Sequence, residues 1–419
     1  MTTVPRAHRA PAPAGALAWR NAIFVVFMLP GIAMATWVSR LPAVRDSLEL
    51  RTDQVGFLVF GVAAGSIIGL LLSGHIVARF GARATMLVGT IVLSAGVAIA
   101  GFGATVGPVF AVTFGGLVVL GFASGITDVA MNVSGAANER VLDRSIMPIF
   151  HAFFSFGTML GAGLGALAEL LGVPIAIHLG VIAAVMVIGI IVAVRYVQPE
   201  GGAHTDEKAS SGSWRDRLAI WRDPRTLLVG LVVLAAAFAE GSANDWIAIA
   251  MVDGHDVSNA TGALVFGVFV TAMTAGRLGG VKLLDRFGRV PVLRASFLLA
   301  AVGLLLIIVV PNAWVAAGAA VLWGLGAALG FPVGMSAAAD DPATAAARVS
   351  AVATIGYFAF LVGPPVIGYL GEHFGILPSL LVVLVLCALG LLVSGSTREP
   401  ARSAEPEVDA FADPALPPR

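Results

Sequence analysis

Apolar residues in this chain are gathered into long continuous runs that are separated by shorter polar segments. A helix needs about 20 mainly apolar residues to cross the hydrocarbon core of a bilayer. The sequence offers twelve runs of roughly this length, at 20–39, 55–75, 84–104, 108–136, 146–170, 173–195, 226–250, 261–283, 291–311, 313–337, 349–371 and 375–395. The pattern therefore predicts an all-α membrane protein with twelve transmembrane helices.

The two halves of the chain share short sequence motifs. The pentapeptide Leu-Val-Phe-Gly-Val stands at 58–62 and again at 264–268, and each copy is followed by Arg-Phe-Gly, at 79–81 and at 286–288. Such a repeat at half the chain length is typical of a membrane protein built by duplication. We therefore expect two pseudo-symmetric six-helix bundles that share one orientation and are related by an axis along the membrane normal.

These observations divide the chain into five segments. A tail at 1–19 precedes the first bundle at 20–195, and a second bundle at 226–395 precedes a tail at 396–419 that is rich in Pro, Ala, Glu and Asp. The segment 196–225 between the bundles is rich in Pro, Gly, Ser and charge, which is typical of a linker. Trp214, Leu218 and Trp221 share a helical face in this linker, so a short interfacial helix is one interpretation and a solvated linker is the other.

Composition and charge agree with a membrane protein and orient it. Hydrophobic residues make up 58% of the chain and charged residues 12%, against about 25% charged residues in soluble domains. Among the basic residues, Arg40, Arg45 and Arg51 alone fall on one side of the predicted membrane. Because cytoplasmic loops carry the excess of Lys and Arg, both termini are expected in the cytoplasm.

Several classes of chemistry lack their sequence signals. Cys387 is the single cysteine, and no second His or Cys stands at metal-ligand spacing from His151. No phosphate-binding loop is present, which argues against transport driven by ATP. We therefore expect no enzyme activity, no cofactor, no metal site and no nucleic-acid partner.

The duplicated loops carry a family resemblance. The Arg-Phe-Gly-x-Arg loop at 79–83, its counterpart at 285–289 and the two six-helix halves resemble the major facilitator superfamily, over about residues 20 to 395. In that family the loop has an acidic residue before the Arg and latches the halves in the outward-facing state. Asp285 fits this pattern, whereas Ala78 stands at the acidic position of the first copy. The resemblance implies gating roles for Arg79, Arg83, Asp285, Arg286 and Arg289, while a purely topological role stays open for Arg83 and Arg289.

Three further segments are similar to narrower groups within the superfamily. The sequences at 37–42, 125–132 and 148–155 look like those of bacterial sugar-permease-type members and of a related inner-membrane group. This resemblance implies a multi-pass protein of the bacterial cytoplasmic membrane that carries a sugar or a related small polar solute.

Asp128 is the leading candidate for proton coupling. A charge at the centre of a transmembrane helix costs about 2.5 to 3.5 kcal/mol on insertion scales, so such residues are functional by default. Asp128 shares a helical stripe with Gly121, Gly125 and Asn132, and we expect the stripe to face a cavity between the halves. Asn132 is accordingly a candidate for substrate binding. The alternative is a structural aspartate that a helix dipole or a basic partner neutralises.

His151 and Ser155 form a second polar stripe, on the fifth predicted span. Histidine titrates near physiological pH, so His151 is a candidate for sharing a proton with Asp128, and Ser155 for contacting the substrate. A histidine of the inner gate that bonds to backbone is the alternative.

The seventh span carries Glu240 near its middle, and Asn244 and Asp245 follow toward the outside. Glu240 is the second candidate for proton coupling, and Asn244 is a candidate for substrate binding. Because this span corresponds to the first, we expect Arg40 to pair with Asp245 across the outer mouth as a gate. Anchoring of Arg40 at the headgroups is the alternative.

Trp323 and Tyr357 are candidates for a stacking wall against a sugar ring, with ordinary packing as the alternative. The sequence as a whole predicts a monomeric secondary active transporter whose partners are a small-molecule substrate, protons and the lipid bilayer. A proton-driven exporter of drug-like or amphipathic compounds and a membrane sensor without transport remain alternatives.

Overall fold

The computed structural model describes residues 15–143, 146–199, 220–341 and 344–399. Most of the predicted linker, including Trp214 and Leu218, and both predicted tails except for a few residues lie outside these ranges. The described residues are almost entirely helical, which confirms the predicted class.

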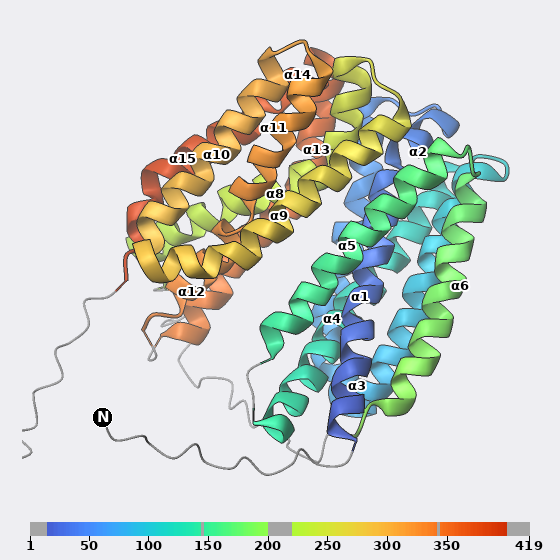
Figure 1. Ribbon diagram of the computed structural model, residues 1–419, viewed down its shortest axis with the longest axis vertical. Helices are drawn as coiled ribbons and strands as arrows, with labels where there is room; N and C mark the ends of the chain where they lie inside the picture. Colours follow the sequence, from blue (N-terminus) through green and yellow to red (C-terminus); the bar gives the residue numbers. More distant parts are fainter. Residues whose placement is uncertain (1–14, 144–145, 200–219, 342–343, 400–419) are drawn as a thin grey trace, which may run out of the picture.

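The helices form two groups (Figure 1). The first group, called the N-half, consists of α1 (Ala16–Ser39), α2 (Leu41–Ser47), α3 (Thr52–Thr105), α4 (Phe110–Leu142), α5 (Met147–Leu170), α6 (Ile175–Ala193) and η1 (Val194–Tyr196). The second, the C-half, consists of α8 (Pro224–His255), α9 (Asn259–Phe287), α10 (Arg289–Val309), α11 (Ala313–Ala327), α12 (Gly330–Ala338), α13 (Ala345–Phe374), α14 (Ile376–Ser379), α15 (Leu381–Val393) and η2 (Ser394–Thr397).

Eleven helices of the described chain are long and apolar enough to cross a membrane. One of them, α3, has 54 residues, which at about 1.5 Å per residue exceeds the thickness of the hydrocarbon core of a bilayer more than twofold. It bends at Gly81, whose backbone is not helical. The two predicted runs at 55–75 and 84–104 thus lie in the two arms of α3.

The duplicated loops adopt the same backbone conformation. Gly81 has φ 76° and ψ 158°, and Gly288 between α9 and α10 has φ 75° and ψ 172°. A Cβ atom disfavours positive φ, and glycine has none, so glycine makes this turn without strain. The repeated Arg-Phe-Gly therefore encodes a repeated bend at which the chain reverses direction.

The tenth predicted run, 313–337, is divided into α11 and α12. Pro332 has no backbone N–H, so the carbonyl four residues earlier, at Ala328, loses its helical donor. The structure ends α11 at Ala327 and begins α12 at Gly330. The proline thus leaves one carbonyl inside the C-half free for another donor.

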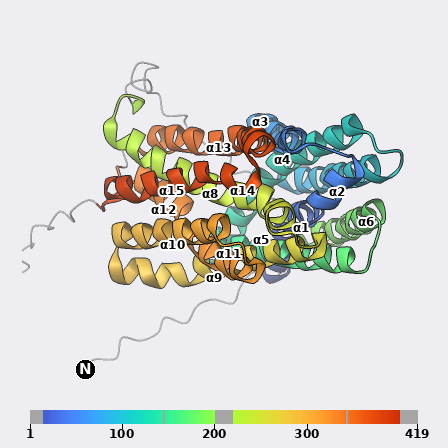
Figure 2. The same cartoon turned by 90° about the horizontal axis from the view of Figure 1, so that it is seen from above.

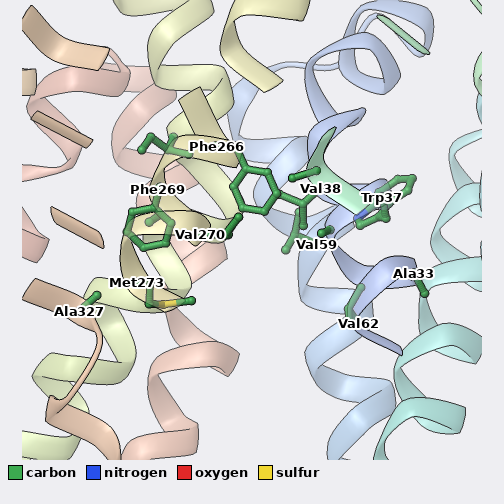
Figure 3. Close-up of a cluster of buried hydrophobic side chains, with 14 of the residues drawn as sticks. Ala33, Trp37, Val38, Val59, Val62, Phe266, Phe269, Val270, Met273 and Ala327 are labelled. Carbon is green, nitrogen blue, oxygen red and sulfur yellow. The ribbon is translucent and has the colours of Figure 1, made fainter. Parts of the chain in front are cut away.

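The two halves lie side by side when seen from above (Figure 2), and along their length they meet at one end and diverge at the other (Figure 1). At the closed end, where α1 ends and α2 lies, α3 packs against α13 and α5 against α9. Figure 3 shows the apolar contact there, in which Phe266 of α9 points toward Val38 of α1 and Val59 of α3. The opposite end, where α1 begins, is called the open end.

Candidate functional site

Asp128 lies near the middle of α4 and is accessible to solvent, although neighbouring helices enclose it. Its backbone carbonyl accepts a hydrogen bond from Asn132 Nδ2 at 2.8 Å, and its Oδ1 lies 3.4 Å from the same nitrogen. Among the described residues it forms no ion pair. Asp128 is thus a solvent-accessible carboxyl group without a basic partner in the described part of the chain.

Arg277 and Glu240 form an ion pair at membrane depth in the C-half. Arg277 Nη2 of α9 lies 2.8 Å from Glu240 Oε1 of α8, and the side chains are 32% and 18% exposed. Arg277 Nε also donates to the Ala328 carbonyl at 3.4 Å, the carbonyl that Pro332 deprives of its helical donor. The helix break therefore helps to hold the arginine.

Arg277 was not recognised as a site residue from the sequence. The charge pattern groups it with the basic residues near the cytoplasmic end of its span, yet α9 continues for ten residues beyond it to Phe287. An arginine so far inside an apolar helix indicates a functional residue by itself. Pro332 is a second indication, because it frees the carbonyl that Arg277 binds.

Polar residues of the two halves face each other across the space between them. Asp128 on α4 lies within electrostatic range of Tyr357 on α13, and Arg277 on α9 lies within electrostatic range of His151 on α5. We call this group, with the Glu240 that pairs with Arg277, the central polar group. Predicted residues of opposite halves thus approach each other at two places, Asp128 near Tyr357 and His151 near the Arg277–Glu240 pair, and their functional roles stay predictions.

Other predicted substrate residues lie elsewhere or bond within their own helix. Trp323 is fully buried, packs edge-on against Phe269 and donates its indole N–H to the Ala239 carbonyl at 3.0 Å. Its expected place in a stacking wall is therefore wrong in this structure, because the whole ring is consumed by packing in the C-half. Ser155 is 6% exposed and donates to the His151 carbonyl. Asn244 is partly buried beside Asp245.

The expected Arg40–Asp245 gate is not formed. Arg40 is 3% exposed, its Nε lies 3.1 Å from Glu169 Oε2, and its Nη2 donates to the Val173 carbonyl at 2.8 Å. Arg40 therefore pairs inside the N-half, because the end of α1 packs against the end of α5 rather than against α8.

The polar contacts between the halves lie beyond Arg40, at the closed end. They are the ion pair of Arg45 with Asp253, a hydrogen bond of 2.9 Å from Asn259 Nδ2 to Asp46, one of 2.9 Å from the Thr52 backbone N–H to Glu372, and an ion pair of 3.9 Å between Arg51 Nε and Glu372 Oε1. A close backbone contact accompanies them, since a Cβ on Gly56 of α3 would lie 2.5 Å from the Pro364 carbonyl of α13. We call these polar contacts the closed-end clasp.

The duplicated loops make no ion pair between the halves in the described chain. Arg289 Nη1 lies 2.7 Å from Oδ1 of Asp340. Asp340 follows the end of α12, so this ion pair lies within the C-half. Arg79 and Arg286 each lie over the phenylalanine that follows, Phe80 and Phe287. Arg83 and Asp285 are exposed. The latch expected for the outward-facing state is therefore open here.

A recess of about 850 Å³ lies beside the crossing of α5 and α9. Its lining is apolar for the most part, and Trp314, which is 81% exposed, stands at its rim. The lining residues include Met159, Ala162, Leu167, Leu264, Val268 and Val321. This recess is separate in character from the central polar group, because it has no charged residue in its lining.

Comparison with protein families and curated proteins gives one consistent result. The model of the Major Facilitator Superfamily matches residues 22–281 and 241–417. An uncharacterised transporter of Sinorhizobium fredii is 30% identical over 355 residues, which cover 84% of this chain and 91% of that protein. An uncharacterised MFS-type transporter of Yersinia pestis is 29% identical and covers 90% of this chain and 94% of its own length. Membrane protein MosC of Rhizobium meliloti is 26% identical over 391 residues, 92% of each protein.

Solved structures share the fold at low sequence identity. The nucleoside transporter NupG, in a mutant form, superposes with a TM-score of 0.72 at 15% identity and covers 91% of this chain and 98% of its own. A bacterial homologue of the human lysosomal transporter Spinster, in an inward-facing and unoccupied conformation, gives 0.70 at 13% identity, with 93% and 100% covered. The transporter FucP in its outward conformation gives 0.62 at 16% identity, with 91% and 98% covered.

Proposed function

Because this chain belongs to the major facilitator superfamily of membrane transporters, we propose that it moves a small polar solute, such as a sugar or a related metabolite, in a proton-coupled alternating-access cycle. Secondary transporters of this fold bind substrate near the bilayer midplane between two repeats, and rocking of one repeat against the other opens the site to each side in turn. The observation that carries the proposal is the position of Asp128 and the Arg277–Glu240 pair in the central polar group.

The proposal includes a topology. Counting the two arms of α3 separately makes twelve spans, and the distribution of basic residues puts both termini and the open end of the halves in the bacterial cytoplasm. The conformation is then inward-facing, with the closed-end clasp on the outer side. The open state of the loop at 285–289 agrees with this assignment.

The chemistry of the central polar group suits a neutral solute with hydroxyl groups. Arg277 and Glu240 neutralise each other, and each uses part of its hydrogen-bonding capacity in the pair. The remaining guanidinium N–H groups donate and the second carboxylate oxygen accepts, so a hydroxyl can satisfy both. Asp128, without a basic partner, is the group that takes and releases the proton, and His151 stands opposite Arg277 to assist.

Flux measurements test this assignment. Purified protein in liposomes receives a panel of labelled monosaccharides and polyols under an imposed proton gradient, with a pH-sensitive dye in the lumen. We expect uptake that acidifies the lumen, and we expect Asp128→Asn to abolish coupled uptake. Asp143→Asn is the matched control, because Asp143 ends the same helix at φ 48°, a conformation that Asn tolerates. Coupled flux that survives in Asp128→Asn contradicts the assignment, and ligand binding without any flux favours a sensor.

The recess between α5 and α9 favours one alternative, export of an amphipathic compound. A largely apolar recess of this size suits a molecule that partitions into lipid. If the panel of sugars gives no flux, hydrophobic dyes are the next probes, and faster dye uptake into proton-loaded vesicles, with protons leaving in exchange, supports this alternative.

A further inference from the structure

Asp245 is a buried acid that the proposed cycle does not use. It lies on α8, is 9% exposed, and forms no hydrogen bond or ion pair with any residue in the described ranges. Its expected partner Arg40 is bound to Glu169 instead. An unpaired carboxylate at this depth is costly while it is ionised, and such groups neutralise by taking up a proton.

Neighbours on α8 show where this carboxylate lies. Gly241, four residues before it, packs against Phe360 of α13, and the carbonyl of Ala248, three residues after it, packs against Gly262 of α9. Residues at these spacings share one helical face. Asp245 therefore lies between the two C-half helices, α9 and α13, that contact the N-half.

The level of Asp245 along the helix puts it within the closed-end seal. It precedes the end of α8 at His255 by ten residues, or about 15 Å. The apolar contact of Phe266 with Val38 and Val59 (Figure 3) and the closed-end clasp lie on the same side of the membrane. Glu240 and Arg277, by comparison, lie deeper, toward the open end.

Charged and titratable groups on the elements around α8 are directed elsewhere. The carboxyl group of Asp245 is buried, and no charged group of the described chain lies close enough to act on it electrostatically. On α2, Arg45 faces Asp46 and Asp253, and on α9, Arg277 faces Glu240. The other titratable groups on the helices packed against α8 are Arg20 of α1, Lys282, Asp285 and Arg286 of α9, Arg348, Tyr357, Tyr369, Glu372 and His373 of α13 and Cys387 of α15, and none of them is paired with Asp245.

We propose that Asp245 is a proton-binding site of the outer seal, which holds a proton while the closed end is shut and releases it to external water when the halves part there. This role rests on the proposed topology and alternating access, and it adds a site distinct from Asp128. Asp245 then links the conformational equilibrium to the external pH rather than carrying the coupled proton inward.

The sign of the pH effect follows from linkage. Opening the closed end releases a proton from Asp245, so a higher pH favours the outward-open state and a lower pH favours the closed end. With one linked proton, the ratio of outward-open to inward-open protein changes by at most about tenfold per pH unit. The Arg45–Asp253 ion pair also holds the closed end shut, separately from Asp245.

Spin labels on the closed end measure this ratio. Cys387 is fully buried, so labels attach to Val106→Cys after α3 and Val309→Cys at the end of α10, both exposed. Distance distributions are recorded in nanodiscs between about pH 5 and about pH 9. We expect the long-distance population to rise with pH in the parent protein. In Asp245→Asn, which stays neutral, we expect a predominantly closed form without pH dependence, while Asp245→Glu keeps the pH dependence.

Two control variants distinguish the role of Asp245 from the roles of the clasp and of Asp128. Asp253→Asn removes the ion pair with Arg45, so it shifts the ratio toward open at each pH and leaves the slope with pH unchanged. Asp128→Asn abolishes coupled flux but keeps the slope, so the failure of one proposal is distinguishable from the failure of the other. If Asp245→Asn does not fold, Asp245→Ser serves as the neutral variant. A pH slope that persists in a folded neutral variant overturns the proposal.

Discussion

The charged residues at membrane depth differ in how far they are exposed, and this exposure distinguishes structural residues from candidate binding residues. Arg40 and Glu169 are 4% and 17% exposed and lie within the packing of the N-half. Arg277 and Glu240 are 32% and 18% exposed and open toward the other half. We therefore expect the first pair to contribute to stability, whereas the second is the pair that we propose to bind the solute.

At this scale the Arg40–Glu169 pair makes a prediction about stability. Glu169→Gln leaves the buried guanidinium without its counter-charge, and breaking a buried pair costs about 3 kcal/mol or more. We expect a clear drop in the melting temperature of the purified protein. Asp53→Asn is the control, because its partner Arg51 is exposed and the change should leave the melting temperature almost unaltered. Equal effects of the two variants contradict a structural role for Arg40.

The same residues show how far a sequence indicates a site. Asp128, His151 and Glu240 were predicted because polar groups in apolar runs need a reason, and Tyr357 was predicted as an aromatic wall. The structure places Asp128 near Tyr357 and His151 near the partner of Glu240, Arg277, while their roles stay predictions. Trp323 was misplaced because periodicity does not distinguish a cavity wall from a core. The partner of Arg40 was wrong because an ion pair depends on which helix ends cross, and that is a property of packing.

At the scale of helices, the apolar runs correspond to the observed spans, but two breaks depend on particular residues. Gly81 divides α3 through its positive φ, and Pro332 divides the tenth run by removing a hydrogen-bond donor. Glycines also set how close helices come. A Cβ on Gly121 of α4 would lie 2.0 Å from the Val62 carbonyl of α3, so these helices pack backbone to backbone.

This contact predicts an effect of added volume. Gly121→Ala forces α3 and α4 apart, and overpacking of this kind costs about 1 to 3 kcal/mol. Gly115→Ala is the matched control on the same helix, since a Cβ there has no atom within 4 Å, and it should be neutral or slightly stabilising. Thermal unfolding of both variants in detergent compares them. A Gly121→Ala protein as stable as Gly115→Ala rules out the tight contact.

For the whole molecule, the closed-end clasp and the apolar seal hold the two halves together on one side. The clasp joins α2 of the N-half to α8 and α9 of the C-half through Arg45, Asp46, Asp253 and Asn259. In the proposed alternating-access cycle, rocking of the halves breaks these contacts and brings the loops at 79–83 and 285–289 toward each other at the opposite end.

Weakening the clasp should therefore shift the conformational equilibrium. Asp253→Asn removes an ion pair whose side chains are 14% and 34% exposed, so we expect about 1 kcal/mol, or about a fivefold larger outward-open fraction. Val59→Cys, placed in the seal, reports this as faster reaction with a membrane-impermeant thiol reagent added outside. Asp256→Asn, at the residue that follows the end of the same helix, is the matched control and should leave the rate unchanged. An unaltered rate in Asp253→Asn shows that the pair does not hold the seal.

The sequence by itself determined the class of the protein, because the cost of exposing polar backbone to lipid makes every membrane span a long apolar run, and such runs are visible in one dimension. It also revealed the duplication, since the repeated Arg-Phe-Gly encodes a repeated bend. The tertiary structure alone decided which charges meet. Arg277 meets Glu240, Arg40 meets Glu169, and Asp245 meets no cation in the described chain. Such pairing depends on how distant helices cross, and hydrophobic periodicity carries no record of that.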